Sequence, residues 1–140
     1  MSGENLEVVR RWWEGFNERG MPSLDLCDER IEIANPPEFP VRGSFHGHEG
    51  VRQWRDQVFE VMDDLEIETE RLIDAGDGQT VVMFLRLRGV ASHTRIQFDE
   101  PWAAVWRIRN GRLLHAQGYV DRHKALDAAG LSESARRHLQ

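Results

Sequence analysis

The chain has 140 residues, of which 40% are apolar and 30% are charged, and this length and composition suit one soluble globular domain. Its formal net charge of −6 and its single lysine, Lys124, argue against a partner that is a nucleic acid or an anionic membrane surface. A single cysteine excludes an intrachain disulfide, and no apolar run is long enough for a signal or membrane segment, so we expect a cytoplasmic protein.

The first half of the chain carries mainly helical patterns. Apolar residues recur at helical spacing between residues 4 and 19, which predicts an amphipathic helix. A short helix is expected over residues 22–27, and apolar and charged residues alternate as a brief strand at residues 30–33. After an irregular loop at residues 34–43, apolar residues at helical spacing predict a third helix over about residues 48–65.

The second half carries strand patterns. Between residues 66 and 120 we expect three or four long strands, separated by turn signals at AGDG, at ASHT and at Asn110-Gly111. A closing helix is predicted over residues 122–128. Helices followed by long antiparallel strands indicate an α+β fold.

The Asn-Gly turn predicts a register for the last two strands. A two-residue turn pairs Arg109 with Arg112, and each further pair then has residue numbers that sum to 221. The pairs expected on one aromatic, inward face are Ile108 with Leu113, Trp106 with His115, Ala104 with Gln117, and Trp102 with Tyr119. The opposite face would pair small residues and favour a homodimer through it. One more step pairs Glu100 with Asp121, unless a bulge at Pro101 separates these carboxylates.

Four segments carry a resemblance to a known family: ENLEVVRRWWEGFNERG, GSFHGHEGVRQW, AAVWRIRNGRL and YVDRHKALDAAGL. Their order resembles the SnoaL-like polyketide-cyclase branch of the nuclear-transport-factor-2-like superfamily. The resemblance implies one domain over residues 1–131, with residues 132–140 as a tail. It implies a curved antiparallel sheet wrapped as a cone around a ligand pocket, a cystatin-like α+β barrel with helices on the concave side, and frequent dimers through the outer face.

The same resemblance suggests roles for two residues. In polyketide-cyclase members an Asp near the end of the last strand is the acid-base group, and Asp121 is at the similar position. In ketosteroid-isomerase-like members an Asp before a proline is the base, but Asn35 stands there, and an amide has no useful basicity. Asn35 could instead orient a ligand carbonyl. Asp121 also precedes a predicted helix, where Asp is a favoured N-cap residue.

Several further side chains are candidates for the site. His115 is the best candidate for proton transfer near neutral pH, and Tyr119 for donating to a ligand oxygen, although either could serve only in packing. The expected ligand-binding residues are Phe16, Asn35, Trp54, Arg86, Trp102, Trp106 and Gln117. An inward Arg86 would need an acidic partner or ligand; on the outer face it would be solvated. His46 and His48 have strand spacing but lack a third ligand at a recognised spacing, so no metal site is predicted.

These observations leave several functions open. One is a cofactor-independent acid-base enzyme of the cyclase type, which acts on a hydrophobic ketone or polyketide-like ligand through Asp121, His115 and Tyr119. A dehydratase or an epoxide hydrolase on the same fold would need similar groups. The alternative is a non-catalytic binding or accessory dimer module for an apolar or aromatic metabolite. A third is a structural dimer module whose interior is filled by its own side chains.

Overall fold

The computed structural model of the chain describes residues 2–131, so the predicted tail at residues 132–140 lies outside the described part. Three α-helices, one 3-10 helix and six strands follow one another in this order: α1 Ser2–Arg19, η1 Leu24–Leu26, β1 Cys27–Ala34, β2 Ser44–His46, α2 Gly47–Val61, β3 Met62–Asp74, β4 Thr80–Ala91, β5 Gln97–Arg109, β6 Arg112–Tyr119 and α3 Arg122–Ala128. Within the described part, no helix is both long and apolar enough to cross a membrane.

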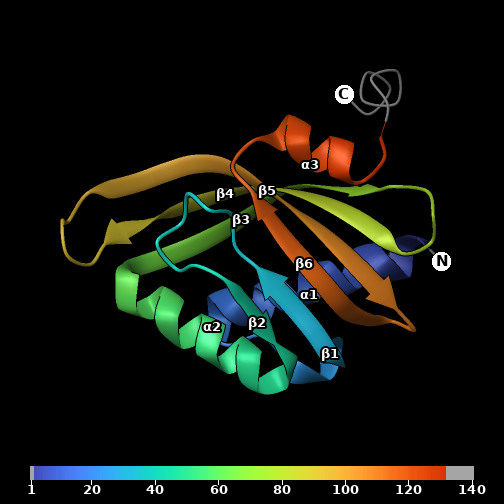
Figure 1. Cartoon of the computed structure of the whole chain (residues 1–140), viewed down its shortest axis with the longest axis horizontal. Coiled ribbons are helices and arrows are strands. Elements are labelled where there is room, and N and C mark those ends of the chain that lie inside the picture. The colour runs from blue at the N-terminus through green and yellow to red at the C-terminus, as the bar shows by residue number, and fades with distance from the viewer. Residues whose placement is uncertain (1, 132–140) are drawn as a thin grey trace.

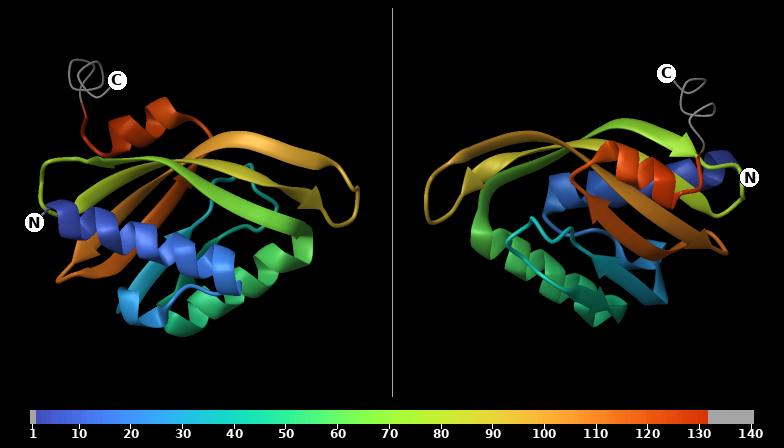
Figure 2. Two further views of the ribbon diagram at one scale, coloured as in Figure 1. Left: turned by 180° about the vertical axis from the view of Figure 1, so that it is seen from behind. Right: turned by 45° about the horizontal axis from the view of Figure 1, so that its top comes forward.

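The six strands form one curved sheet in the order β2-β1-β6-β5-β4-β3 (Figure 1). Two helices, α1 and α2, lie on its concave side, whereas α3 lies on the convex side (Figure 2). The expected α+β cone is therefore confirmed. The sheet is mixed rather than wholly antiparallel, because β1 and β6 run parallel while the other neighbours run antiparallel.

The first helix forms as its apolar period predicts. Val9, Trp12, Trp13 and Phe16 recur at helical spacing, and all four are buried against the concave face of the sheet. Gly20 ends the helix with a positive φ of 71°, and its N–H donates to the carbonyl of Phe16. Burial of this stripe anchors α1 over the sheet.

The third predicted helix ends earlier than its apolar pattern suggests. α2 stops at Val61, and Met62 already has extended φ and ψ angles of −131° and 128° as the first residue of β3. Met62 and Ile67 are buried in the same core, so these apolar residues continue the pattern although the chain has changed to a strand. Short apolar patterns fit both periods, and here the packing selects the strand.

The β5–β6 hairpin has the predicted turn but a different register. Arg109 pairs with Arg112 and Ile108 with Leu113, after which Leu114 is an extra residue in β6. The following pairs are Arg107 with His115, Trp106 with Ala116, Val105 with Gln117, Ala104 with Gly118 and Ala103 with Tyr119. The predicted faces are therefore wrong beyond Leu113, because the bulge turns His115, Gln117 and Tyr119 away from Trp106.

Crowding on the concave side explains this register. It places Ala116 and Gly118, the smallest residues of β6, on the inner face beside the large Trp106 ring. A Cβ atom on Gly118 would lie only 2.8 Å from Cδ of Pro36, so that position accepts no side chain. The register that sums to 221 would bring the larger Gln117 and Tyr119 side chains to this face.

The convex face is partly covered by α3. Ala125 and Leu126 of the helix form a buried cluster with Ile73, Val82, Ala103 and Val105, and Tyr119 packs against it. Ala103 and Val105 pair with Tyr119 and Gln117, so the small, flat outer face predicted for dimerisation does not exist in that form. A homodimer stays a prediction.

Candidate ligand-binding cavity

A cavity of about 80 Å³ lies between the concave face of the sheet and the helices α1 and α2. All five tryptophans of the chain line it, together with Phe16 and Phe39. Of the residues that the structure describes, none with a titratable side chain forms part of its wall. The cavity is therefore strongly apolar and carries only a few polar atoms.

The aromatic wall is held by edge-to-face packing. Trp12 and Trp13 from α1 approach Trp106 of β5 with ring centroids 5.4 and 6.1 Å apart and interplanar angles of 64° and 80°. Trp13 also meets Phe16 edge to face at 5.5 Å. Such arrangements are favoured beyond the burial of area alone, so they keep the rings in defined positions.

Asn35 joins the cavity wall to the loop that follows β1. Its Nδ2 donates to the carbonyl oxygen of Val41 at 2.9 Å, and its Oδ1 accepts from Nε1 of Trp54 at 3.1 Å. The side-chain amide thus orients the Trp54 ring and holds the loop against the sheet. That Asn35 orients a ligand stays a prediction. Only the second N–H of its amide would then be available to bind the ligand.

The five indole N–H groups fall into two classes. Those of Trp54 and Trp102 have acceptors, Oδ1 of Asn35 and Oε2 of Glu100. Those of Trp12, Trp13 and Trp106 are buried and have no hydrogen-bond partner in the described structure. These three N–H groups lack an acceptor but are covered by other atoms, so they are not exposed to the cavity space.

An outer cleft of about 320 Å³ adjoins the cavity. Phe39, Leu87 and Trp102 line both spaces, and the Phe39 and Trp102 rings meet edge to face at 5.4 Å. Glu38 and Glu100 are the titratable residues of the cleft wall among those described. The Phe39–Trp102 ring pair therefore lies between the apolar cavity and a cleft with a carboxylate rim.

The structure brings together five of the residues predicted for the site: Phe16, Asn35, Trp54, Trp102 and Trp106 all line the cavity. Trp12, Trp13 and Phe39 line the cavity too, but the sequence analysis named none of them as site residues. The aromatic stripe of α1 was a usable signal for the two tryptophans. Phe39 lies in a loop without periodicity, so no pattern could have placed it.

The predicted catalytic residues lie outside this cavity wall. Asp121 is exposed, and its Oδ1 accepts from the backbone N–H of His123 at 2.8 Å and of Lys124 at 3.4 Å, which confirms the predicted N-cap. Tyr119 packs against the cluster under α3. Nε2 of His115 lies 3.6 Å from the carboxylate of Glu32. The structure therefore does not gather these three side chains around the aromatic rings.

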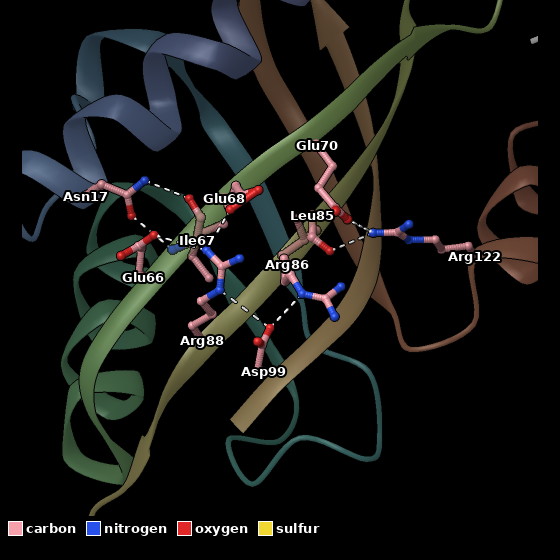
Figure 3. A network of polar contacts seen from close by, with 10 residues as sticks. All are labelled: Asn17, Glu66, Ile67, Glu68, Glu70, Leu85, Arg86, Arg88, Asp99 and Arg122. Carbon is pink, nitrogen blue, oxygen red and sulfur yellow. Dashed lines mark hydrogen bonds and ion pairs between the residues drawn. The ribbon is translucent and has the colours of Figure 1, made fainter. Parts of the chain in front are cut away.

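Two predicted ligand-binding residues also face away from the cavity. Arg86 lies between the cavity-lining Leu85 and Leu87, so its side chain is on the other face, where Nε bonds Oδ1 of Asp99 at 2.6 Å (Figure 3). Gln117 donates to the carbonyl oxygen of Gly118. Arg86 therefore takes the outer-face alternative, with an acidic partner from β5.

The two histidines of the HGHE segment contact different parts of the structure. Nε2 of His46 lies 3.7 Å from Glu32, whereas Nε2 of His48 lies 3.2 Å from the carbonyl oxygen of Cys27. Within residues 2–131, no group of three or more His, Cys, Asp and Glu side chains has a geometry that could hold a metal ion. The pair has local structural contacts instead.

Comparison with known proteins places this fold in a family. The model of the SnoaL-like domain matches residues 9–116, while no curated protein matches the chain. An NTF2-like protein of unknown function from Burkholderia pseudomallei superimposes with a TM-score of 0.74 at 21% identity, covering 89% of this chain and 95% of that one.

Two other solved structures are similar at lower identity. A putative SnoaL-like polyketide cyclase from Jannaschia sp. has a TM-score of 0.71 at 16% identity, with 94% of each chain covered. TerC, co-crystallised with polyporic acid, has a TM-score of 0.72 at 19% identity, covering 91% of this chain and 98% of its own. At these identities the likeness shows the fold, which is that of NTF2-like proteins. The family model covers more than half of the sequence, and the chain therefore belongs to the family of SnoaL-like domains.

Proposed function

We propose that this protein is a small-molecule-binding domain that holds a compact apolar ligand in its aromatic cavity without transforming it. The observation that carries the proposal is the composition of the cavity wall, which has aromatic rings and, within residues 2–131, no titratable side chain. Acid-base catalysis needs a titratable group within hydrogen-bond reach of the reacting atoms. An apolar wall with a few polar atoms is the usual character of a binding pocket.

The size of the cavity limits the ligand. Pockets for drug-sized ligands are usually about 300–1,000 Å³, whereas this cavity has about 80 Å³. A cavity that binds a benzene ring has about 150 Å³, so a single ring enters this space only if side chains of the wall move apart. A longer ligand would have to part the Phe39–Trp102 ring pair and extend into the outer cleft of about 320 Å³.

A second candidate is an acid-base enzyme of the cyclase type that works at the outer cleft. It is favoured by Glu100, a carboxylate of the cleft wall whose Oε2 accepts from Nε1 of Trp102 at 3.3 Å. The fold likeness to a putative SnoaL-like polyketide cyclase is consistent with it. The roles predicted for Asp121, His115 and Tyr119 belong to this candidate and stay predictions, as do the homodimer and the cytoplasmic location.

A ligand screen tests the main proposal. The protein is titrated with compact cyclic and larger polycyclic compounds, thermal stabilisation is measured, and every hit is incubated and analysed by mass spectrometry. We expect stabilisation by compact compounds and no change in their mass or ultraviolet spectrum. A hit that is converted, with the conversion lost in Glu100→Gln or Asp121→Asn, would instead establish the enzyme.

A cavity-filling variant locates the binding. Ala104 is buried in the cavity wall, so Ala104→Leu puts extra carbon atoms into the space that the ligand would use. We expect this variant to lose the stabilisation by compact ligands. The matched control is Ala128→Leu on the exposed side of α3, which should keep it. Equal stabilisation of both variants would place the ligand elsewhere.

A further inference from the structure

Glu100 of β5 lies on the concave side of the sheet, at the outer cleft. Its partner across β4 is Leu87, which is buried and lines the cleft, and residues that pair across a sheet share a face. Oε2 of Glu100 also accepts from Nε1 of Trp102, another residue of the cleft wall, at 3.3 Å. The neighbouring Asp99 contacts Arg86 on the convex side, as alternation along a strand requires (Figure 3). The carboxylate of Glu100 is therefore directed toward the cleft.

The carboxylates of this cleft differ from those of the convex face in their partners. On the convex face, Arg88 lies 2.6 Å from a carboxylate oxygen of Glu68 and 3.5 Å from one of Asp99 (Figure 3). Within residues 2–131, neither Glu100 nor Glu38, the second carboxylate of the cleft wall, forms an ion pair with an Arg, Lys or His side chain. The described part of the cleft therefore holds two negative charges without a positive partner.

The rest of the cleft wall is apolar. Phe39, Met62 and Leu87 line it as buried residues, and the wall contains no Lys, Arg or His within residues 2–131. The volume of about 320 Å³ is at the lower end of the range for pockets that bind drug-sized molecules, about 300–1,000 Å³. Because Glu38 and Glu100 are exposed, the cleft offers apolar contact in its interior and negative charge where it meets solvent.

We infer that the outer cleft is a second ligand site, which takes a small free amine with an apolar body. The protonated amine pairs with Glu100 and Glu38, and the hydrocarbon part contacts the buried interior of the cleft. An anionic ligand is repelled, and a neutral one gains only the apolar contact. This inference goes beyond the function proposed above, because the Phe39–Trp102 ring pair lies between the cleft and the aromatic cavity.

Three probes with the same apolar body test this inference: 4-phenylbutylamine, 4-phenylbutan-1-ol and 4-phenylbutyrate. At pH 7 they are a cation, a neutral molecule and an anion, and their dissociation constants are measured by calorimetry at low salt. We expect the amine to bind about fivefold or more tightly than the alcohol, as for one ion pair near the surface, and the carboxylate to bind most weakly. The preference for the amine should shrink as salt is added, because salt screens exposed charges. An amine that binds no better than the alcohol, or binding of none of the three, would overturn the inference.

Variants of the same shape test the two carboxylates. Glu100→Gln and Glu38→Gln each remove one negative charge, and Glu100→Gln keeps an oxygen that can accept from Trp102. We expect each to lower the amine-to-alcohol affinity ratio about two- to fivefold, and the double variant to bring the ratio close to one. The matched control is Glu29→Gln, an exposed position of β1 outside the cleft wall, which changes the net charge equally and should keep the ratio. An unchanged ratio in the double variant, or an equal loss in the control, would contradict the assignment.

Two space-filling variants distinguish the cleft from the aromatic cavity. Ala91 lines the cleft and not the cavity, whereas Ala104 lines the cavity and not the cleft. We expect Ala91→Leu to weaken the binding of 4-phenylbutylamine and Ala104→Leu to leave it unchanged. Loss of amine binding in Ala104→Leu alone would place the amine in the aromatic cavity and overturn the inference. The function proposed above is tested separately, because it fails if compact apolar ligands do not stabilise the protein, whatever the amine does.

Discussion

Arg122, the first residue of α3, donates from Nε to the carbonyl oxygen of Trp102 at 3.2 Å. Its Nη2 donates to the carbonyl oxygen of Leu85 at 3.0 Å and also pairs with Glu70, as Figure 3 shows. The guanidinium lies 4.7 Å from the ring centroid of Phe84. Because Trp102 and Leu85 line the cavity, one side chain on the convex face fixes the backbone behind the cavity wall.

We expect Arg122→Met to destabilise the protein. The change removes hydrogen bonds from a charged group to two backbone carbonyls, worth about 1.5–3 kcal/mol each in comparable cases, although partial exposure reduces the sum. Urea unfolding measures the loss. The matched control is Arg86→Met, because the two arginine side chains are 30% and 31% exposed, yet among residues 2–131 the partner of Arg86 is a side chain, that of Asp99. The Arg86→Met variant should lose less than about 1 kcal/mol in the free energy of unfolding. Equal losses in the two variants would contradict the role assigned to Arg122.

Asn17 should prove important for the edge strand β3. Its Nδ2 donates to the carbonyl of Ile67 at 2.7 Å and its Oδ1 accepts from the N–H of Ile67 at 3.2 Å, so the amide replaces a neighbouring strand at that point (Figure 3). Asn17→Ala leaves both backbone groups unpaired, and we expect a loss of about 1–3 kcal/mol in the free energy of unfolding. It should also expose an edge that favours association, which light scattering detects.

The control for this variant is Asn5→Ala. Asn5 lies on the same helix and makes one exposed bond, to the carbonyl of Gly78 at 3.0 Å. We expect its effect to stay within about 0.5 kcal/mol, as for most surface substitutions. If the two variants were equally destabilised, the pairing of Asn17 with β3 would have no special value.

The cap at Asp121 predicts a contrast between two substitutions. Asp121→Ala removes the oxygen that accepts from His123 and Lys124, and N-cap losses of this kind cost about 0.5–2 kcal/mol. Asp121→Asn keeps an acceptor of similar capping strength, so its thermal stability should remain close to that of the wild type. If Asn were as destabilising as Ala, the carboxylate charge rather than the cap would be the stabilising feature.

Burial should make Cys27 unreactive in the folded protein. Desolvation raises the pKa of its thiol from an ordinary value of 9.0 to about 12. At pH 8 the folded protein therefore holds a neutral thiol, which is a poor nucleophile. We expect a disulfide reagent such as Ellman's reagent to react with Cys27 only after urea unfolding. Fast reaction in buffer alone would contradict the buried position.

The same shift has a consequence for stability at alkaline pH. The thiol of Cys27 has a higher pKa in the folded protein than in the unfolded chain. The neutral thiol therefore adds its full contribution to the free energy of unfolding below pH 9, and this contribution is lost as the pH rises from 9 to about 12. Urea midpoints measured over this range should fall less steeply in Cys27→Ala than in the wild type. Parallel slopes in the two proteins would show that other groups cause the alkaline loss.

Local patterns in the sequence were sufficient for most elements. The apolar period predicted α1, the turn signals separated β3 to β6, and the Asp before residue 122 predicted the start of α3. Each of these depends on neighbours within a few residues: a helical stripe, a turn that needs Asn-Gly, or a side-chain cap. Signals that depend on such near neighbours can be identified directly in the sequence.

The cavity and the placement of the predicted catalytic residues depended on contacts between distant segments. The Leu114 bulge decides that His115 lies by Glu32 rather than by Trp106, and no local signal marks it. Pro36 lies against Gly118, although more than 80 residues separate them in the sequence. This contact selects the observed register, because only glycine leaves enough space there. The sequence by itself determined the elements and the family, whereas the tertiary structure decided which side chains share a face, because register depends on how large and small residues fit across the sheet.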